Sequence, residues 1–458
     1  MKIAIDITPL QNLHSARGIG SVVRNLLSKL EYCNLNTDEF IFLAYEHDDS
    51  NIEGIVRDLV DNKVNYTINF VFPSTGFEPK KPNRFISIFK RFSPKSAHKL
   101  TGFTHRLTTF AKKALGLIKL RAGLRSREIK SINDLSPDIY FQLDPTILLP
   151  NLPTNTKTVV MFHDLIPYIM VNDYFWDYRV SRINGLSRIR SVKNSLQRYT
   201  YLNIARNNSR HADSIITNSN QTKLDLIKFI GCPADKIKVS LLGVNKSDTA
   251  ATNNLTDHIT RFVHTSWGSH PIKTPLPNKP FIHYVGGADP RRKLNDIVAS
   301  FNNIKSRGHD IALILAGDTM QGWDNVPNDS FVDYMSLHST FEDDIYFVGY
   351  VDKERLFWLY KNSLAFVYPT VYEGFGLPIL EAMQYGTPVI TYKNSSIPEV
   401  AGDAAMYAKD FLEITDHVIN LLENPKIREK YSKLGKKQAS KFSWQKTTNN
   451  FIQALKSL

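Results

Sequence analysis

Cysteine is scarce in this sequence: among 458 residues there are two, Cys33 and Cys232. Two cysteines are too few for a disulfide scaffold or a cysteine-rich metal site, and they are typical of a reducing compartment. Long apolar runs are also missing, because no stretch of 18 apolar residues occurs, which excludes a membrane-spanning helix. The start of the chain, MKIAIDITPL, lacks the apolar core of a signal peptide. We therefore expect a cytoplasmic protein.

Acidic residues are nearly absent from one segment, residues 80–130. It holds fifteen Lys or Arg and one acid, Glu128, a net charge of +14, so the rest of the chain carries −1 of the total of +13. Apolar residues recur in it at helical steps of three and four: Phe103, Leu107, Phe110, Ala114, Leu117, Leu120 and Leu124. An apolar stripe beside cations fits an anionic bilayer surface; a stripe that packs on the neighbouring domain is the alternative. Because the cations are confined to this segment, we expect no nucleic-acid partner.

Apolar, β-branched stretches alternate with helical ones along the rest of the chain. In the first half the expected strands are residues 2–6, 138–143, 158–164 and 214–219. In the second half they are residues 281–285, 311–316, 345–351, 364–369 and 389–392, with helices that begin near Lys293, Lys353 and Leu377. This alternation predicts parallel sheets with helices on both faces, and the length fits two domains. We therefore expect an α/β protein with two doubly wound, Rossmann-like domains.

The segment VYEGFGLPILEAMQYGTP, residues 371–388, combines two acids with a glycine-containing turn. Glu373 lies in that turn, directly after an expected strand, and Glu381 lies in the helix that begins at Leu377. Backbone N–H groups at a helix N-terminus bind phosphate, and glycine lets a ligand approach the backbone closely. A carboxylate beside such a site can accept hydrogen bonds from sugar hydroxyls. Together these features predict a site for a nucleotide sugar.

This segment resembles the signature of glycosyltransferase family 4: two Glu eight positions apart, a Gly-Phe-Gly-Leu-Pro core, and a later Gly-Thr-Pro-Val-Ile. The family consists of retaining enzymes with the GT-B fold, in which two doubly wound domains face each other across a cleft. The resemblance implies a hexosyltransferase that uses a UDP- or GDP-sugar, with mannose or glucose as examples. It is strongest to bacterial enzymes of surface polysaccharide synthesis, such as exopolysaccharide and O-antigen. It therefore implies a polyprenyl-linked saccharide acceptor and a peripheral position on the inner face of the cell membrane.

A second cationic element, from Gly286 to Lys293, follows an expected strand and opens a helix. Three consecutive cations at a helix N-terminus oppose the helix dipole, so we expect them to bind an anion such as diphosphate. The resemblance implies an Arg-Lys pair that neutralises the leaving diphosphate. Arg292 and Lys293 fit this pair, with Arg291 as the alternative arginine, and Gly287 is expected beside the substrate.

The resemblance also assigns roles to single residues. Glu373 is expected to hold the donor sugar and stabilise oxocarbenium-like charge, and Glu381 to hold the ribose. His163, at the carboxyl end of a strand where such sheets bind ligands, is expected to donate a hydrogen bond to the sugar. The catalytic set is therefore Glu373, His163, Arg292 and Lys293. Further substrate contacts are expected at Gly18, Gly20, Gly374, Phe375, Gly376 and Leu377.

We expect four parts along the chain. Residues 1–245 form the acceptor-binding domain with the basic insertion at 80–130, and residues 246–279, rich in Thr, Asn, Pro and Ser, form a linker. Residues 280–435 form the domain that binds the nucleotide sugar. By the resemblance, residues 436–458 form a helix that crosses back to the first domain.

The sequence contains no HExxH motif and no Cys/His cluster with metal-ligand spacing, so we expect no metal and no cofactor. Two other GT-B functions are alternatives to the transferase. One is an inactive scaffold that binds a sugar nucleotide for a partner glycosyltransferase, and the other is a phosphorylase. The presence of both Glu, the cationic pair and the His favours the transferase.

Overall fold

The computed structural model describes residues 1–11, 18–32, 38–45, 51–72, 132–150, 152–170, 188–245, 258–265, 268–321, 329–338 and 340–458. The basic segment 80–130, for which an amphipathic helix is expected, lies outside these residues. The chain divides into two compact units. The first comprises Met1–Met161, Asn207–Ser214 and Ser457–Leu458, and the second comprises Phe162–Arg206 and Ile215–Lys456.

The N-terminal sheet has the strand order β3-β2-β1-β4-β5-β6-β7. Its strands are β1 (Lys2–Asp6), β2 (Glu39–Tyr45), β3 (Tyr66–Phe72), β4 (Ile139–Gln142), β5 (Lys157–Phe162), β6 (Ser214–Thr217) and β7 (Ile237–Val239). The described pairings are parallel, with Ile3 opposite both Phe40 and Ile139. Helices of this half are α1 (Gly18–Leu27), α2 (Ile52–Leu59), α5 (Ile166–Ile169), α8 (Arg188–His211) and α9 (Asn220–Asp225). Nearly every residue of β1, β4 and β5 is buried, which explains their continuous apolar sequences.

The C-terminal sheet has the order β15-β14-β13-β10-β11-β12-β8-β9. Its strands are β8 (His258–Thr265), β9 (Gly268–Pro275), β10 (Phe281–Val285), β11 (Ala312–Ala316), β12 (Ile345–Gly349), β13 (Ala365–Tyr368), β14 (Val389–Tyr392) and β15 (Ala405–Ala408). Strands β10 to β15 pair in parallel, whereas β8 and β9 are antiparallel. The two doubly wound α/β sheets are thus as predicted. The antiparallel hairpin β8–β9 is an addition to the edge of the second sheet, within the stretch for which no strand was expected.

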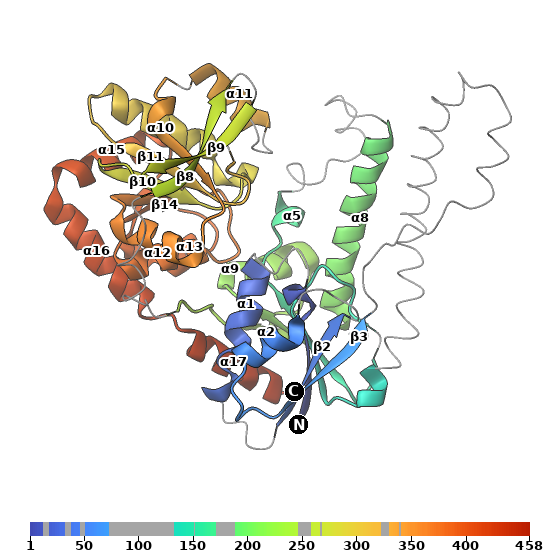
Figure 1. The fold of residues 1–458 in the computed structure, drawn as a ribbon. Coiled ribbons are helices and arrows are strands. Elements are labelled where there is room, and N and C mark those ends of the chain that lie inside the picture. Colours follow the sequence, from blue (N-terminus) through green and yellow to red (C-terminus); the bar gives the residue numbers. More distant parts are fainter. Residues whose placement is uncertain are drawn as a thin grey trace, which may run out of the picture. The chain divides into compact units, whose positions relative to one another are not determined.

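Helices cover both faces of the C-terminal sheet (Figure 1). The helices of this half of the chain are α10 (Leu294–Ser306), α11 (Asp329–His338), α12 (Lys353–Asn362), α13 (Leu377–Tyr385), α14 (Ile397–Ala401), α15 (Phe411–Glu423), α16 (Pro425–Ala439) and α17 (Trp444–Lys456). Helices α10 and α15 pack together on one face, and α12, α13 and α16 lie on the other. In α10 the buried side chains Leu294, Ile297, Phe301 and Ile304 recur at steps of three and four, the period of an amphipathic helix. No helix in the described part of the chain is both long and apolar enough to cross a bilayer.

His283 lies at the centre of the C-terminal sheet, on β10, and is fully buried. Its ring packs against Tyr360 and Phe366, with centroids 5.2 and 5.0 Å away. Neither ring nitrogen has a well-formed hydrogen bond among the described residues, although the backbone of Ala365 gives slight support to the protonated form. Burial therefore lowers the pKa of His283 from 6.5 to about 3.

This histidine should make the fold sensitive to acid. In the unfolded chain His283 takes up a proton below its ordinary pKa of 6.5, whereas in the folded chain it stays neutral down to about 3. The free energy of unfolding therefore loses about 1.4 kcal/mol per pH unit below 6.5, or about 2 kcal/mol at pH 5. In urea unfolding of His283→Phe, the free energy of unfolding should fall less steeply between pH 8 and 5 than it does in the wild type. His258→Gln, which removes an exposed histidine from β8, should keep the wild-type slope, and equal slopes in the two variants would contradict the assignment.

Candidate functional site

The loop between β13 and α13 contains the two-glutamate motif. The strand β13 is entirely buried, and α13 begins at Leu377, as predicted, with Pro378 in its first turn. Gly376 precedes the helix with a φ of 106°, a conformation that residues with a side chain rarely adopt. No side chain caps this N-terminus. Because Pro378 has no N–H and the N–H of Ile379 donates to the carbonyl of Gly376, the N–H of Leu377 is the group of this first turn that an anion can engage.

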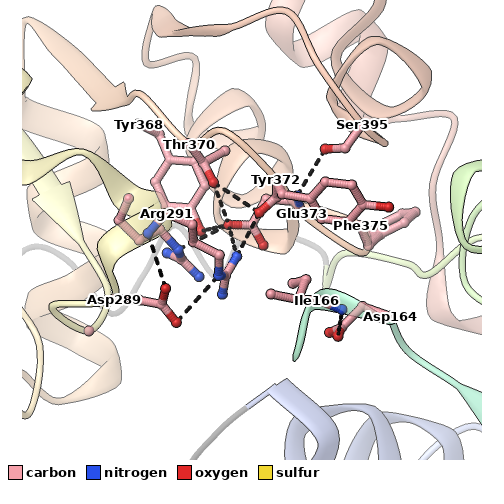
Figure 2. A network of polar contacts seen from close by, with 12 residues as sticks. Asp164, Ile166, Asp289, Arg291, Tyr368, Thr370, Tyr372, Glu373, Phe375 and Ser395 are labelled. Atoms are coloured by element: carbon pink, nitrogen blue, oxygen red, sulfur yellow. Dashed lines mark hydrogen bonds and ion pairs between the residues drawn. The ribbon is translucent and has the colours of Figure 1, made fainter. Parts of the chain in front are cut away.

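Glu373 is buried in this loop, with 7% of its surface exposed, and its carboxylate is surrounded by donors (Figure 2). Nη1 of Arg291 lies 2.6 Å and Nε of Arg292 3.0 Å from its Oε1. The hydroxyls of Tyr368 and Thr370 each lie 3.1 Å from the same oxygen. Its backbone is fixed as well, because its N–H donates to Ser395 and its carbonyl accepts from Ser396. Burial alone would raise the pKa of Glu373, but the charges of Arg292 and Arg291 outweigh it and hold the pKa below its usual value.

The two arginines are held from several sides. Arg291 also donates from Nη1 to the backbone carbonyl of Tyr372 and forms an ion pair with Asp289 at 3.4 Å. Arg292 lies over the ring of Tyr368, 4.6 Å from its centroid, a favourable cation–π geometry. Its Nε is close enough to Glu373 for an ion pair but is not aligned for a hydrogen bond. Arg291 and Arg292 are 12% and 13% exposed, so both are largely buried counter-ions of Glu373.

The structure does not bring Lys293 into this cluster. Lys293 is exposed and has a left-handed backbone with a φ of 44° at the start of α10. The glycine that lies beside Arg292 is Gly286. A Cβ on Gly286, whose φ is 146°, would come within 2.7 Å of Nη1 of Arg292. Gly287 has a normal φ and no close neighbour around the position of a Cβ, and its carbonyl accepts a hydrogen bond from Tyr284.

His163 and Asp164 approach the same loop at Gly374. A Cβ on Gly374 would lie 2.2 Å from the carbonyl oxygen of His163 and 2.7 Å from Cβ of Asp164, so this position requires glycine. The carboxylate of Asp164 accepts a hydrogen bond from the backbone N–H of Ile166. Burial raises the pKa of Asp164, opposed by the charge of Arg291. The sequence predicted a hydrogen bond from His163 to the donor sugar and made no prediction of its contact with Gly374.

The remaining predicted residues are more dispersed. Glu381 accepts a hydrogen bond of 3.0 Å from the buried hydroxyl of Tyr360 on α12, and burial raises the pKa of Glu381. Phe375 is buried with its ring against Phe442, so it stabilises the loop by packing. Gly18 and Gly20 begin α1 in the first unit. Among the described residues no group of three His, Cys, Asp or Glu could hold a metal ion.

Part of the C-terminal half matches a known protein family. Residues 269–438 match the family described as glycosyl transferases group 1. The chain is 30% identical over 250 residues to the O-antigen chain mannosyltransferase B of Escherichia coli, an alignment that covers 54% of this chain and 61% of that protein. It is 23% identical over 352 residues to the serotype-specific mannosyltransferase WbdA of Escherichia coli, which covers 74% of this chain and 39% of that protein. The chain thus spans less than two thirds of the length of these relatives.

Solved structures share the whole fold at low sequence identity. Sucrose-phosphate synthase from Thermosynechococcus elongatus has a TM-score of 0.61 at 16% identity, over 100% of this chain and 98% of that chain. Anabaena HepE in complex with UDP and glucose has a TM-score of 0.60 at 13% identity, over 100% of both chains. At these identities the likeness shows the GT-B fold alone. Residues 269–438, which contain the two-glutamate motif, are thus similar to the glycosyl transferases group 1, in agreement with the resemblance of that motif.

Proposed function

We propose that this protein is a retaining hexosyltransferase of cell-surface polysaccharide synthesis. It transfers a hexose from a UDP- or GDP-sugar to a lipid-linked saccharide. The observation that supports this best is Glu373, an ionised and buried carboxylate between two arginines, directly before an uncapped helix N-terminus. A negative charge in that place favours a cationic sugar centre, and the helix N-terminus favours a diphosphate. Mannose is the favoured hexose because the similar Escherichia coli proteins are named mannosyltransferases.

Each residue has a role in the proposed reaction. The bond between the anomeric carbon and the diphosphate oxygen breaks, and the acceptor hydroxyl attacks from the same face, so that the configuration is retained. A diphosphate oxygen takes the proton of that hydroxyl. Glu373 stabilises the positive charge that develops on the sugar, and His163 donates a hydrogen bond to a sugar hydroxyl. Lys293, which is exposed at the start of α10, joins the N–H of Leu377 at the diphosphate.

Arg291 and Arg292 contribute to the same site through Glu373. Their charges keep this carboxylate ionised in a buried place, and they add positive potential where the diphosphate departs. Because two guanidinium groups, one ammonium group and a helix N-terminus supply this potential, we propose that the reaction needs no metal. Glu381 accepts hydrogen bonds from the ribose hydroxyls, which requires that it exchange its present donor, Tyr360.

Donor binding tests this function. Calorimetry with a panel of UDP- and GDP-sugars should show saturable binding of one donor by the wild-type protein. Glu381→Ala should weaken that binding about tenfold or more, because a hydrogen bond to a charged group contributes about 1.5–3 kcal/mol. Glu354→Ala, which removes an exposed carboxylate from α12, serves as the control. Binding of no donor would contradict the transferase, whereas binding without transfer to any acceptor would favour the scaffold.

We further propose that residues 80–130 attach the enzyme to the anionic inner face of the membrane. The net charge of +14 and the apolar stripe of this segment support this. Deletion of residues 80–130 should abolish co-sedimentation with vesicles of anionic phospholipid. Vesicles of zwitterionic lipid are the control and should bind neither protein. Unchanged sedimentation of the deletion variant would contradict this role of the segment.

A further inference from the structure

One oxygen of Glu373 takes all the contacts of its carboxylate. Arg291, Arg292, Tyr368 and Thr370 all lie within 3.1 Å of Oε1, and Oε2 has no partner among the described residues. The dashed lines in Figure 2 show this convergence. A carboxylate held by one oxygen keeps its second oxygen in a defined place. The groups on Oε1 therefore determine where Oε2 lies.

The hydroxyl donors on Oε1 are not equivalent. Thr370 has one hydroxyl proton and lies 3.1 Å both from Oε1 and from the carbonyl oxygen of Tyr372, so it serves one acceptor at a time. The hydroxyl of Tyr368 donates to Oε1. Burial raises the pKa of Tyr368 well above its ordinary value, so the phenol keeps its proton. Tyr368 is thus the uncharged donor that, unlike Thr370, does not divide its proton between Oε1 and a second acceptor.

The ring of Tyr368 is itself fixed. It is fully buried on β13 and stacks on Tyr284 and Phe366, with centroids 6.0 and 5.3 Å away. The guanidinium of Arg292 covers it at 4.6 Å. One tyrosine therefore contacts Glu373 through its hydroxyl and Arg292 through its ring, so it sets the geometry of the ion pair between them.

We propose that Tyr368 is a positioning residue for the transfer reaction: its hydroxyl anchors Oε1 of Glu373 among the arginines, which leaves Oε2 to meet the donor sugar. This inference rests on the proposed function and adds a residue that touches no substrate. Ion pairs depend weakly on direction, whereas a hydrogen bond is directional. Without the hydroxyl, Glu373 stays buried and charged but can turn about its last bond, so that either oxygen meets the arginines. The rate of the chemical step then falls, because this step needs a carboxylate in a fixed position.

Tyr368→Phe tests this with the smallest change, since the ring and its packing stay. We expect kcat to fall about 10- to 100-fold, the equivalent of one hydrogen bond to a charged group, while KM for the donor changes less than about threefold. The ionised form of Glu373 loses a donor, so its pKa rises and the acid limb of the kcat/KM profile moves to higher pH. The control is Tyr407→Phe, which removes a hydroxyl bonded to the carbonyl of Gly402. This control should leave kcat and the acid limb of the kcat/KM profile at their wild-type values.

A purely structural role would give a different pattern. If Tyr368→Phe lowers the melting temperature but leaves kcat and the acid limb at wild-type values, the positioning role is wrong. A wild-type protein that transfers no sugar would instead contradict the proposed function. The contact can then still be tested by urea unfolding of Tyr368→Phe, Glu373→Gln and the double variant. Non-additive losses of stability would support the anchoring of Glu373 by the hydroxyl, and additive losses would overturn it.

Discussion

Glu373→Gln should lower kcat/KM at least a hundredfold and destabilise the fold at the same time. The activity falls because a neutral amide cannot stabilise positive charge on the sugar, and the loss of one preorganised electrostatic group costs about 10²–10³ in rate. The stability falls because Arg291 and Arg292, 12% and 13% exposed, would lose their shared counter-ion, and Arg291 would keep only its longer ion pair with Asp289. Breaking a buried ion pair from one side costs about 3–5 kcal/mol. Initial rates and urea unfolding at pH 7.5 measure the two losses.

The two effects can be separated. Rates are normalised to the folded fraction, which the unfolding curve supplies. Glu354→Gln removes an exposed carboxylate from α12 and should leave rate and stability within error of the wild type. Full activity in Glu373→Gln would exclude Glu373 from the reaction. A loss of stability without a loss of rate would make it a structural counter-ion of the arginines.

The parallel strands were the part of the fold that the sequence specified best. Strands β1, β10 and β14 have the predicted bounds, and α13 begins at the predicted residue. Parallel strands are covered on both faces, so they appear as short continuous apolar runs between glycines and polar turns. In α13 the N-terminal glycine and the following Leu-Pro mark the start of the helix.

Other elements depend on neighbours that the sequence does not indicate. The hairpin β8–β9 is assembled by pairing of β8 with β12, and both Pro271 and Pro275 lie on β9, the strand at the edge of the sheet. Proline is poorly compatible with a central strand, but an edge strand tolerates it. The stretch therefore looked like a linker. Strands β2 and β3 were likewise missed, although β2 is almost wholly buried.

The charged residues of the site were predictable, but their arrangement was not. Glu373 was recognised from the two-glutamate motif, and Arg291 and Arg292 because consecutive cations at a helix N-terminus oppose the helix dipole. The pairing of the two arginines with Glu373 could not be predicted, because they lie about 80 positions apart in the sequence. Tyr368 and Thr370 were missed because aromatic and β-branched residues at the end of a strand are typical of the hydrophobic core. Only the coordinates show that both hydroxyls point to one carboxylate oxygen.

Gly317→Ala should be the most destabilising small substitution near this site. Gly317 follows β11 with a φ of 147°, and a Cβ there would lie 2.1 Å from the carbonyl oxygen of Gly286. Backbone cannot move as a flexible side chain can, so the strain and the steric overlap add. Each is of order 1–3 kcal/mol, and we expect a loss of about 4 kcal/mol in the free energy of unfolding. Because Gly286 begins the loop that carries Arg291 and Arg292, donor binding should weaken as well.

Gly308→Ala provides the matched comparison. Gly308 follows α10 with a φ of 89°, but nothing lies within 4 Å of its Cβ position. Alanine there has the strained backbone without the overlap, so we expect a loss of about 1 kcal/mol and unchanged donor binding. The difference between the two variants isolates the contact between Gly317 and Gly286. Equal losses in urea unfolding would mean that the two loops separate at little cost, and that the contact between Gly317 and Gly286 does not hold the arginines in place.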